Sequence, residues 1–97
     1  MGFFDKAFDW GYKQGLKGIR EKLQKAIREK RLVFIGDNQV LYIDKQGNRT
    51  ECNFEQMVDV AIEAGGWQKN MESLSITHQD VVNILTEEYT KHKKEAK

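Results

Sequence analysis

The apolar residues in the first third of the chain recur at steps of four and three, which is the period of one helical face. They are Phe4, Phe8, Tyr12, Leu16, Ile19, Leu23 and Ile27. This spacing predicts a long amphipathic helix over residues 1–31. Gly11, Gly15 and Gly18 lie along one edge of the apolar face, and they indicate either a bent, weakened helix or the close packing of another segment against it.

Two short runs rich in β-branched and aromatic residues follow, at residues 31–35 and 40–43. Asp37 and Asn38 stand at the centre of the polar turn between them, and because Asp and Asn tolerate positive φ, we expect a hairpin turn of the primed type. A second turn leads to a more polar third strand at residues 49–53. The pattern predicts a three-stranded antiparallel meander over residues 32–54.

The first two strands are apolar on both faces. By alternation, one face carries Leu32, Phe34, Val40 and Tyr42, and the other carries Val33, Ile35, Leu41 and Ile43. An antiparallel sheet with one wet face normally alternates apolar and polar residues, so we expect both sides to be covered. Either the long helix covers one side and the remaining helices the other, or a second copy of the chain covers one side in a homodimer.

The pattern over the rest of the chain predicts two helices. Asn53 and Gln56 form a capping pair ahead of a helix at residues 55–65, which ends at two glycines. After a connection that holds several apolar residues, a second capping box opens a helix at residues 76–92, followed by a basic tail at residues 93–97. The whole chain therefore predicts one α+β domain, residues 1–97, in the order α-β-β-β-α-α.

Charge is unevenly distributed, although the whole chain carries only +1 at pH 7. Residues 1–31 hold nine Lys or Arg and four Asp or Glu, residues 32–90 hold three and ten, and residues 91–97 hold four and one. The three segments are therefore basic, acidic and basic, with net charges of +5, −7 and +3. This layout indicates either a charged partner or pairing between the segments.

The patterns that mark enzymes and metal sites are missing from this short sequence. Cys52 stands alone in mid-strand, where an inert thiol is the ordinary outcome, and His78 and His92 belong to no short pair of ligands. Asp44 and Glu51 face each other across a turn without the lysine of a metal-dependent nuclease. A small hydrolase would need Asp44, Glu51 and His78 to converge. We expect no enzymatic activity, no metal and no cofactor.

The acidic side of the predicted second helix is the first candidate binding surface. Its residues, continued from the third strand, are Glu51, Glu55, Asp59 and Glu63, with Trp67 beside them. A row of carboxylates would steer a protein partner with a basic surface. Trp67 is either a lid on the core or an exposed anchor for that partner.

The basic side of the first helix is the second candidate, for nucleic acid. It is formed by Lys13, Lys17, Arg20, Arg28 and Arg31. Lysine and arginine on one side of a helix neutralise a row of phosphates. The alternative is internal: the helix meets the acidic segment of its own domain.

The element order over residues 4–65 resembles that of double-stranded RNA-binding domains, although the entry to the second helix, Phe54-Glu55-Gln56-Met57, is acidic and apolar where those domains are rich in lysine. With the last helix, the order, small size and acidic second half also resemble some small phage-encoded inhibitors of CRISPR nucleases. We therefore expect a cytoplasmic regulator or inhibitor that acts by protein contact, with nucleic-acid binding as the alternative. The single cysteine and the lack of a secretion signal or a membrane-length apolar segment favour the cytoplasm.

Overall fold

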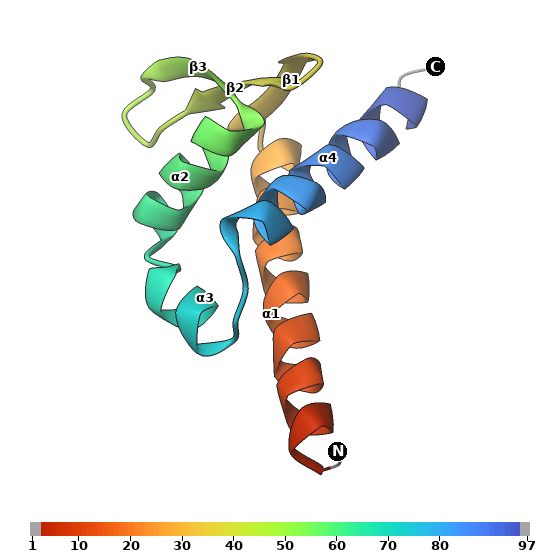
Figure 1. The fold of residues 1–97 in the computed structure, drawn as a ribbon. Coiled ribbons are helices and arrows are strands. Elements are labelled where there is room, and N and C mark those ends of the chain that lie inside the picture. The colour runs from red at the N-terminus through yellow and green to blue at the C-terminus, as the bar shows by residue number, and fades with distance from the viewer. Residues whose placement is uncertain (1–2, 96–97) are drawn as a thin grey trace.

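A computed structural model describes the backbone of residues 3–95 and the side chains of residues 10–95. The elements along the chain are α1 (Phe3–Arg28), β1 (Leu32–Gly36), β2 (Gln39–Ile43), β3 (Arg49–Asn53), α2 (Phe54–Gly65), α3 (Gln68–Ser73) and α4 (His78–Glu95) (Figure 1). The predicted helix, three antiparallel strands and C-terminal helices are confirmed. The short helix α3 lies where a connection was expected, and α4 continues through Glu95, so residues 93–95 belong to that helix rather than to a separate tail.

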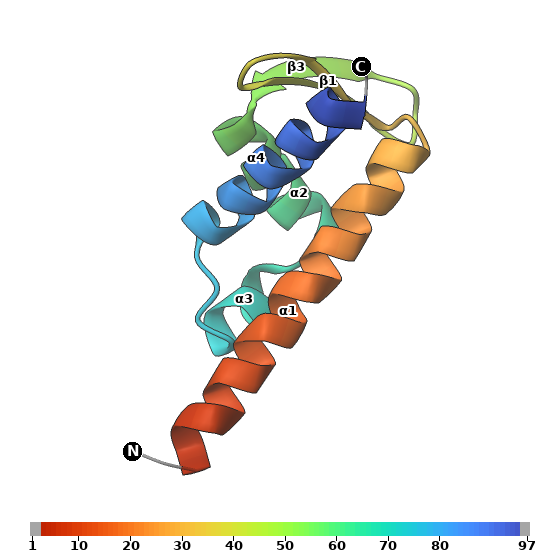
Figure 2. The same ribbon diagram turned by 90° about the vertical axis from the view of Figure 1, so that its right-hand side faces the viewer.

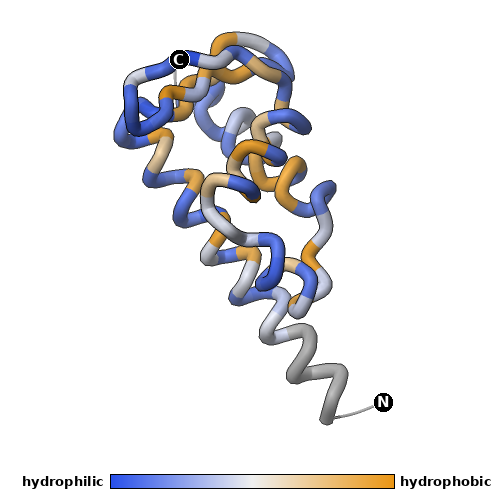
Figure 3. Tube along the Cα trace, turned by 90° about the vertical axis from the view of Figure 1, so that its left-hand side faces the viewer, coloured by the Kyte–Doolittle hydropathy of each residue, from blue (hydrophilic) through white to orange (hydrophobic). Residues whose placement is uncertain are grey.

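Helix α1 uses its apolar face as predicted from Tyr12 onward, and hydrophobic and hydrophilic residues alternate along it (Figure 3). Phe4 and Phe8 lie outside the residues whose side chains are described. The glycines on this helix differ in their surroundings. A Cβ on Gly15 would lie 2.6 Å from Ile76 Cδ1, whereas a Cβ on Gly18 would meet nothing within 4 Å. Close packing therefore explains Gly15 but not Gly18.

The three strands form an antiparallel meander in the order β1-β2-β3. The centre of the first turn is Asp37-Asn38 as predicted, but its type is not. Asn38 alone has a positive φ, of 56°, and the register of β1 shifts between Phe34 and Gly36. Primed turns need positive φ at the first central residue, so a bulged hairpin replaces the expected primed turn.

All of the helices lie on one side of the sheet (Figures 1 and 2). Of the two arrangements considered for covering both sides, the one with helices of the same chain on each side is therefore wrong. Strand alternation shows which side chains share a face, but it does not show where the helices go. One face of the sheet packs against the core, and the other face has no helix or strand of the described chain over it.

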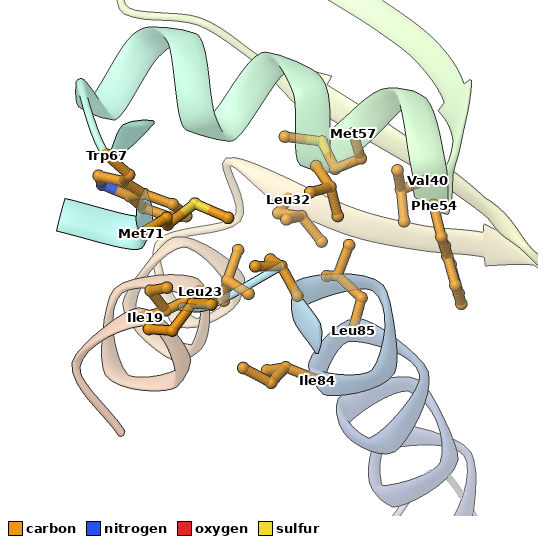
Figure 4. Packing of buried hydrophobic residues seen from close by; sticks show 13 residues of the cluster. Ile19, Leu23, Leu32, Val40, Phe54, Met57, Trp67, Met71, Ile84 and Leu85 are labelled. Carbon is orange, nitrogen blue, oxygen red and sulfur yellow. The ribbon is translucent and has the colours of Figure 1, made fainter. Parts of the chain in front are cut away.

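The core lies where α1, α2 and α4 meet the inner face of the sheet (Figure 4). Leu32 and Val40 point down from β1 and β2 toward Met57 of α2 and Leu85 of α4, and each of these side chains is at most 2% exposed. Leu23 joins them from α1. Burying side chains of this size stabilises a domain by about 1.5–3 kcal/mol each, so this cluster holds the sheet to the helices.

Both predicted capping boxes are present. The Asn53 side chain accepts a hydrogen bond from the Gln56 backbone N–H, and the Gln56 side chain accepts one from the Asn53 N–H. Thr77 and Asp80 exchange the same pair of bonds at the start of α4, at 2.9 and 3.1 Å. These bonds satisfy N–H groups that the first turn of a helix leaves unpaired, which fixes where α2 and α4 begin.

Candidate functional site

Helix α2 carries a line of carboxylates on its exposed side. Glu55, Asp59 and Glu63 follow one another at intervals of four residues, and all three are exposed. The opposite side of α2 is apolar, with Met57 and Val58 buried in the core. The helix is thus oriented by its apolar side, and its acidic side is left facing solvent.

The chain reverses direction directly after this line. Gly66 has a φ of 64°, and its N–H bonds to the carbonyl oxygen of Glu63 at 3.3 Å, which ends α2 in a left-handed cap. Trp67 N–H then bonds to the carbonyl oxygen of Ile62 at 3.1 Å, and Met71 of α3 is buried. These contacts fold α3 back beside the end of α2.

Between α2 and α3 lies a groove with a volume of about 450 Å³. Its apolar lining comes from Ile62, Met71 and Ile76. Its polar lining comes from Asp59, Glu63, Gln68 and Glu72, and includes no lysine or arginine. We call these seven residues the acidic groove. An apolar surface bordered by three carboxylates suits a cationic group that carries an aliphatic stem.

One side of the acidic groove is braced by the start of α4. His78 Nε2 lies 3.0 Å from Asp59 Oδ1 and 3.1 Å from the carbonyl oxygen of Glu55. The imidazole therefore joins α4 to α2 and fixes the position of Asp59, whereas Glu72 accepts a hydrogen bond only within its own helix, from Gln68 at 3.5 Å. The sequence pattern did not point to this role for His78.

The other predicted members of the acidic surface lie elsewhere. Glu51 is paired with Leu41 across β2 and β3, so it points from the outer face of the sheet, away from α2. Trp67 is only 8% exposed and belongs to the core, with the ammonium of Lys22 5.4 Å from its ring centroid. Of the two roles considered for Trp67, the structure fits the lid on the core, and the exposed anchor is wrong for this chain.

Glu72 is the carboxylate of the acidic groove that the sequence pattern did not indicate. It lies on α3, in the stretch that was expected to be a connection. The signal that identifies this helix is the spacing of Trp67, Met71 and Leu74, at steps of four and three. Helices of six residues are short enough for such a signal to be overlooked.

The basic surface of α1 is partly used inside the protein. Arg20 forms ion pairs with Glu87 and, at 2.9 Å, with Glu88 of α4, and Gln24 reaches Glu88 at 3.4 Å. The hydrogen bond to Glu87 is the main cause that raises the pKa of the Arg20 guanidinium above its ordinary value. Arg31 is paired with Glu29 at 2.7 Å. The pairing of Arg20 with the acidic segment confirms the internal alternative for that residue.

Three of the five predicted basic residues remain exposed on α1, namely Lys13, Lys17 and Arg28. Arg20 lies between them in the sequence and is turned toward α4. With Arg20 turned away, eleven positions separate Lys17 from Arg28, so these three residues do not form the continuous row that a phosphate backbone would require for many simultaneous contacts.

The residues considered for catalysis do not converge. Asp44 closes the turn between β2 and β3, where its carboxylate accepts hydrogen bonds from the N–H groups of Asn48 and Gln46, and the bond from Asn48 is the main cause that lowers its pKa. Glu51 lies on the outer face of the sheet and His78 at the start of α4. Burial raises the pKa of the Cys52 thiol. Among the described residues, no three His, Cys, Asp or Glu side chains are grouped as metal ligands.

No protein-family model, curated protein or solved structure matches this chain. Within the part of the chain that is described, no helix is long and apolar enough to cross a membrane. The surface features of the molecule are therefore the basis for a functional proposal.

Proposed function

We propose that the protein binds a basic protein partner through the acidic groove and acts as a small, non-enzymatic regulator or inhibitor. The observation that carries this proposal is the groove itself, about 450 Å³ in volume, in which three carboxylates border an apolar lining. This volume falls within the usual range for binding pockets, roughly 300–1,000 Å³. Asp59 and Glu63 were candidate partner residues on sequence grounds, and Glu72 joins them from α3.

The chemistry of the groove favours lysine or arginine side chains of the partner. Their aliphatic stems would cover Ile62 and Met71 while their charged ends meet the carboxylates. Exposed carboxylates would also accelerate the approach of a basic surface, since long-range attraction raises association rates. A regulator of this kind needs no catalytic activity, because a protein that occupies the basic surface of its partner blocks that surface by binding alone. One cysteine is consistent with a cytoplasmic location.

A short peptide of alternating arginine and leucine is a direct probe of the acidic groove. Two-dimensional NMR with labelled protein should show the largest shift changes at Ile62, Met71 and Ile76, and the affinity should fall as salt is added. We expect Glu63→Lys and Glu72→Lys each to weaken binding about tenfold, since each places a like charge beside the peptide.

The matched control is Glu21→Lys, which makes the same charge change at an exposed position of α1 outside the groove. It should change the affinity by no more than about twofold, because screening limits the effect of distant exposed charges. Equal losses in all three variants would mean that the peptide responds only to net charge. That result, or shift changes centred on another surface, would refute the proposal.

Nucleic-acid binding through α1 is the alternative proposal, supported by the exposure of Lys13, Lys17 and Arg28. Its test is a salt titration of binding to generic duplex DNA and RNA. Micromolar affinity that falls steeply with salt, and that is lost when these three charges and those of Arg20 and Arg31 are reversed, would replace the protein-contact proposal. The free energy of unfolding of the variant in which the Arg20 charge is reversed must be measured in parallel, because Arg20 also pairs with Glu88 of α4.

A further inference from the structure

The outer face of the sheet carries an aliphatic patch. Its four members are Val33, Ile35, Leu41 and Ile43, which we call the outer patch. Their alternates Leu32, Phe34, Val40 and Tyr42 contact the core, whereas none of the outer patch does. Ile35 is 44% exposed, and Val33, Leu41 and Ile43 are half-buried. The patch spans β1 and the central strand β2, on the side of the sheet opposite all of the helices (Figures 1 and 2).

An aliphatic patch on this face is unusual for a sheet whose outer face is exposed to solvent. Antiparallel sheets with one solvated face carry polar residues there, because leaving aliphatic side chains in water forgoes the gain of burial, about 25 cal/mol per Å². Contiguous exposed apolar patches on small soluble domains mark interaction sites. The outer patch therefore indicates that another surface covers the sheet.

The charges beside the patch identify the kind of surface. Arg49 is paired with Ile43 and Glu51 with Leu41 in the register of β2 and β3, so both charges lie on the outer face, two residues apart. Both are exposed, and neither side chain has a hydrogen bond or an ion pair within the described part of the chain. A partner of one sign would match only one of them. An inverted copy of the same strand matches both, because a two-fold axis brings each arginine over the other glutamate.

We propose that two copies of the chain pack their outer patches face to face as a two-fold dimer. The two sheets would form an aligned sandwich, in which Leu41 and Ile43 of one protomer meet the aliphatic row of the other. In this register Arg49 lies opposite Glu51 of the partner subunit, and the reverse holds by symmetry. The dimer covers the second apolar face of the strands, which no helix of the described chain covers.

Analytical ultracentrifugation over a range of concentrations tests the dimer. Wild-type protein should sediment as a dimer, and Leu41→Lys should raise the dimer dissociation constant at least about 100-fold, since it places an unpaired charge at the centre of the interface. Gln79→Lys, at an exposed position of α4, is the control with the same added charge and should leave the dimer unchanged. Far-UV circular dichroism checks that each variant keeps the fold.

Charge exchange between Arg49 and Glu51 tests the two-fold register directly and does not depend on Leu41→Lys folding. Arg49→Glu and Glu51→Arg should each weaken the dimer several-fold, because each leaves like charges opposite one another. The variant with both changes exchanges the two signs and should regain wild-type affinity. A monomer at all concentrations, a dimer that neither Leu41→Lys nor the two single charge changes weaken, or a double variant weaker than either single one would overturn the proposal.

Discussion

The contact between Gly65 and Trp67 provides a sharp test of the packing behind the acidic groove. An ideal Cβ on Gly65 would lie 2.1 Å from Trp67 Nε1 and 2.6 Å from Cε2. Nonbonded atoms pack at about 3.5–4.0 Å, so Gly65→Ala forces the indole to move by an ångström or more. The ring has little freedom to do so, because it is rigid and only 8% exposed.

The expected magnitude follows from two opposing effects. Overpacking a well-filled site costs about 1–3 kcal/mol, and replacing glycine by alanine within a helix returns about 0.5–1 kcal/mol, less at the last residue of a helix. We therefore expect Gly65→Ala to lower the free energy of unfolding by about 1–2 kcal/mol. Gly18→Ala is the matched control, because a Cβ there meets nothing within 4 Å, and it should raise the free energy of unfolding by about 0.5–1 kcal/mol.

Thermal and urea unfolding measure both variants. Since 1 kcal/mol corresponds to about 4–8 °C in a domain of this size, the two melting temperatures should differ by roughly 10 °C. Trp10 is 67% exposed, so a Trp10→Phe background leaves Trp67 as the fluorescent reporter of its own site. Gly65→Ala should shift its emission toward that of a solvated indole. Equal stabilisation by both alanines, with an unchanged spectrum, would refute the packing of Trp67 against Gly65.

Three further predictions concern polar groups. Arg20→Leu should lower the free energy of unfolding by about 1–2 kcal/mol in urea, because it leaves the buried Glu88 without its cation, and Arg20→Leu with Glu88→Leu should recover most of that loss. Asp37→Asn should lower the pKa of the Tyr89 phenol in an NMR titration, since the hydrogen bond that the phenol donates to Asp37, at 2.5 Å, is the main cause that raises this pKa. In the wild type, the stabilisation from this hydrogen bond should be complete below pH about 10 and should be lost as the pH rises through the raised pKa of Tyr89. Alkylation of Cys52 at pH 8 should be slower than in an unstructured peptide and should accelerate with unfolding in urea, since burial raises its pKa.

Local sequence signals predicted the elements well where a side chain acts within its own segment. The capping boxes at Asn53 and Thr77 are examples, because the bonded groups lie three residues apart and need no other part of the chain. The apolar face of α1 is another, since it repeats turn after turn from Tyr12 to Ile27. Helix α3 was missed because a single helical pattern of Trp67, Met71 and Leu74 is too short to stand out.

Features that depend on distant segments could not be predicted in the same way. The sequence identified both apolar faces of β1 and β2, but the placement of every helix on one of them depends on tertiary packing. The acidic line on α2 was predicted, while the groove beside it depends on the reversal at Gly66 that brings α3 next to α2. The pairing of Arg20 with Glu88 joins residues 68 positions apart, beyond the reach of any local pattern.

The two proposed surfaces lie on different parts of the molecule, and this has a measurable consequence. The outer patch lies on the sheet, and the acidic groove lies between α2 and α3, with α3 beyond the end of α2 that points away from the sheet (Figure 1). A dimer formed through the sheet therefore leaves two grooves open. Two linked sites bind a dense array of targets with avidity, which adds a factor of about 10²–10⁴ to the apparent affinity.

A biosensor surface carrying the arginine-leucine peptide at high and low density tests this consequence. At high density the wild-type protein should dissociate much more slowly than Leu41→Lys, whereas both should bind the free peptide in solution equally well, since Leu41 lies outside the groove. The two proposals then fail in different ways. Equal dissociation of the two proteins at high density would argue against the dimer, while loss of solution binding in Leu41→Lys would mean that the peptide occupies the outer patch instead of the acidic groove.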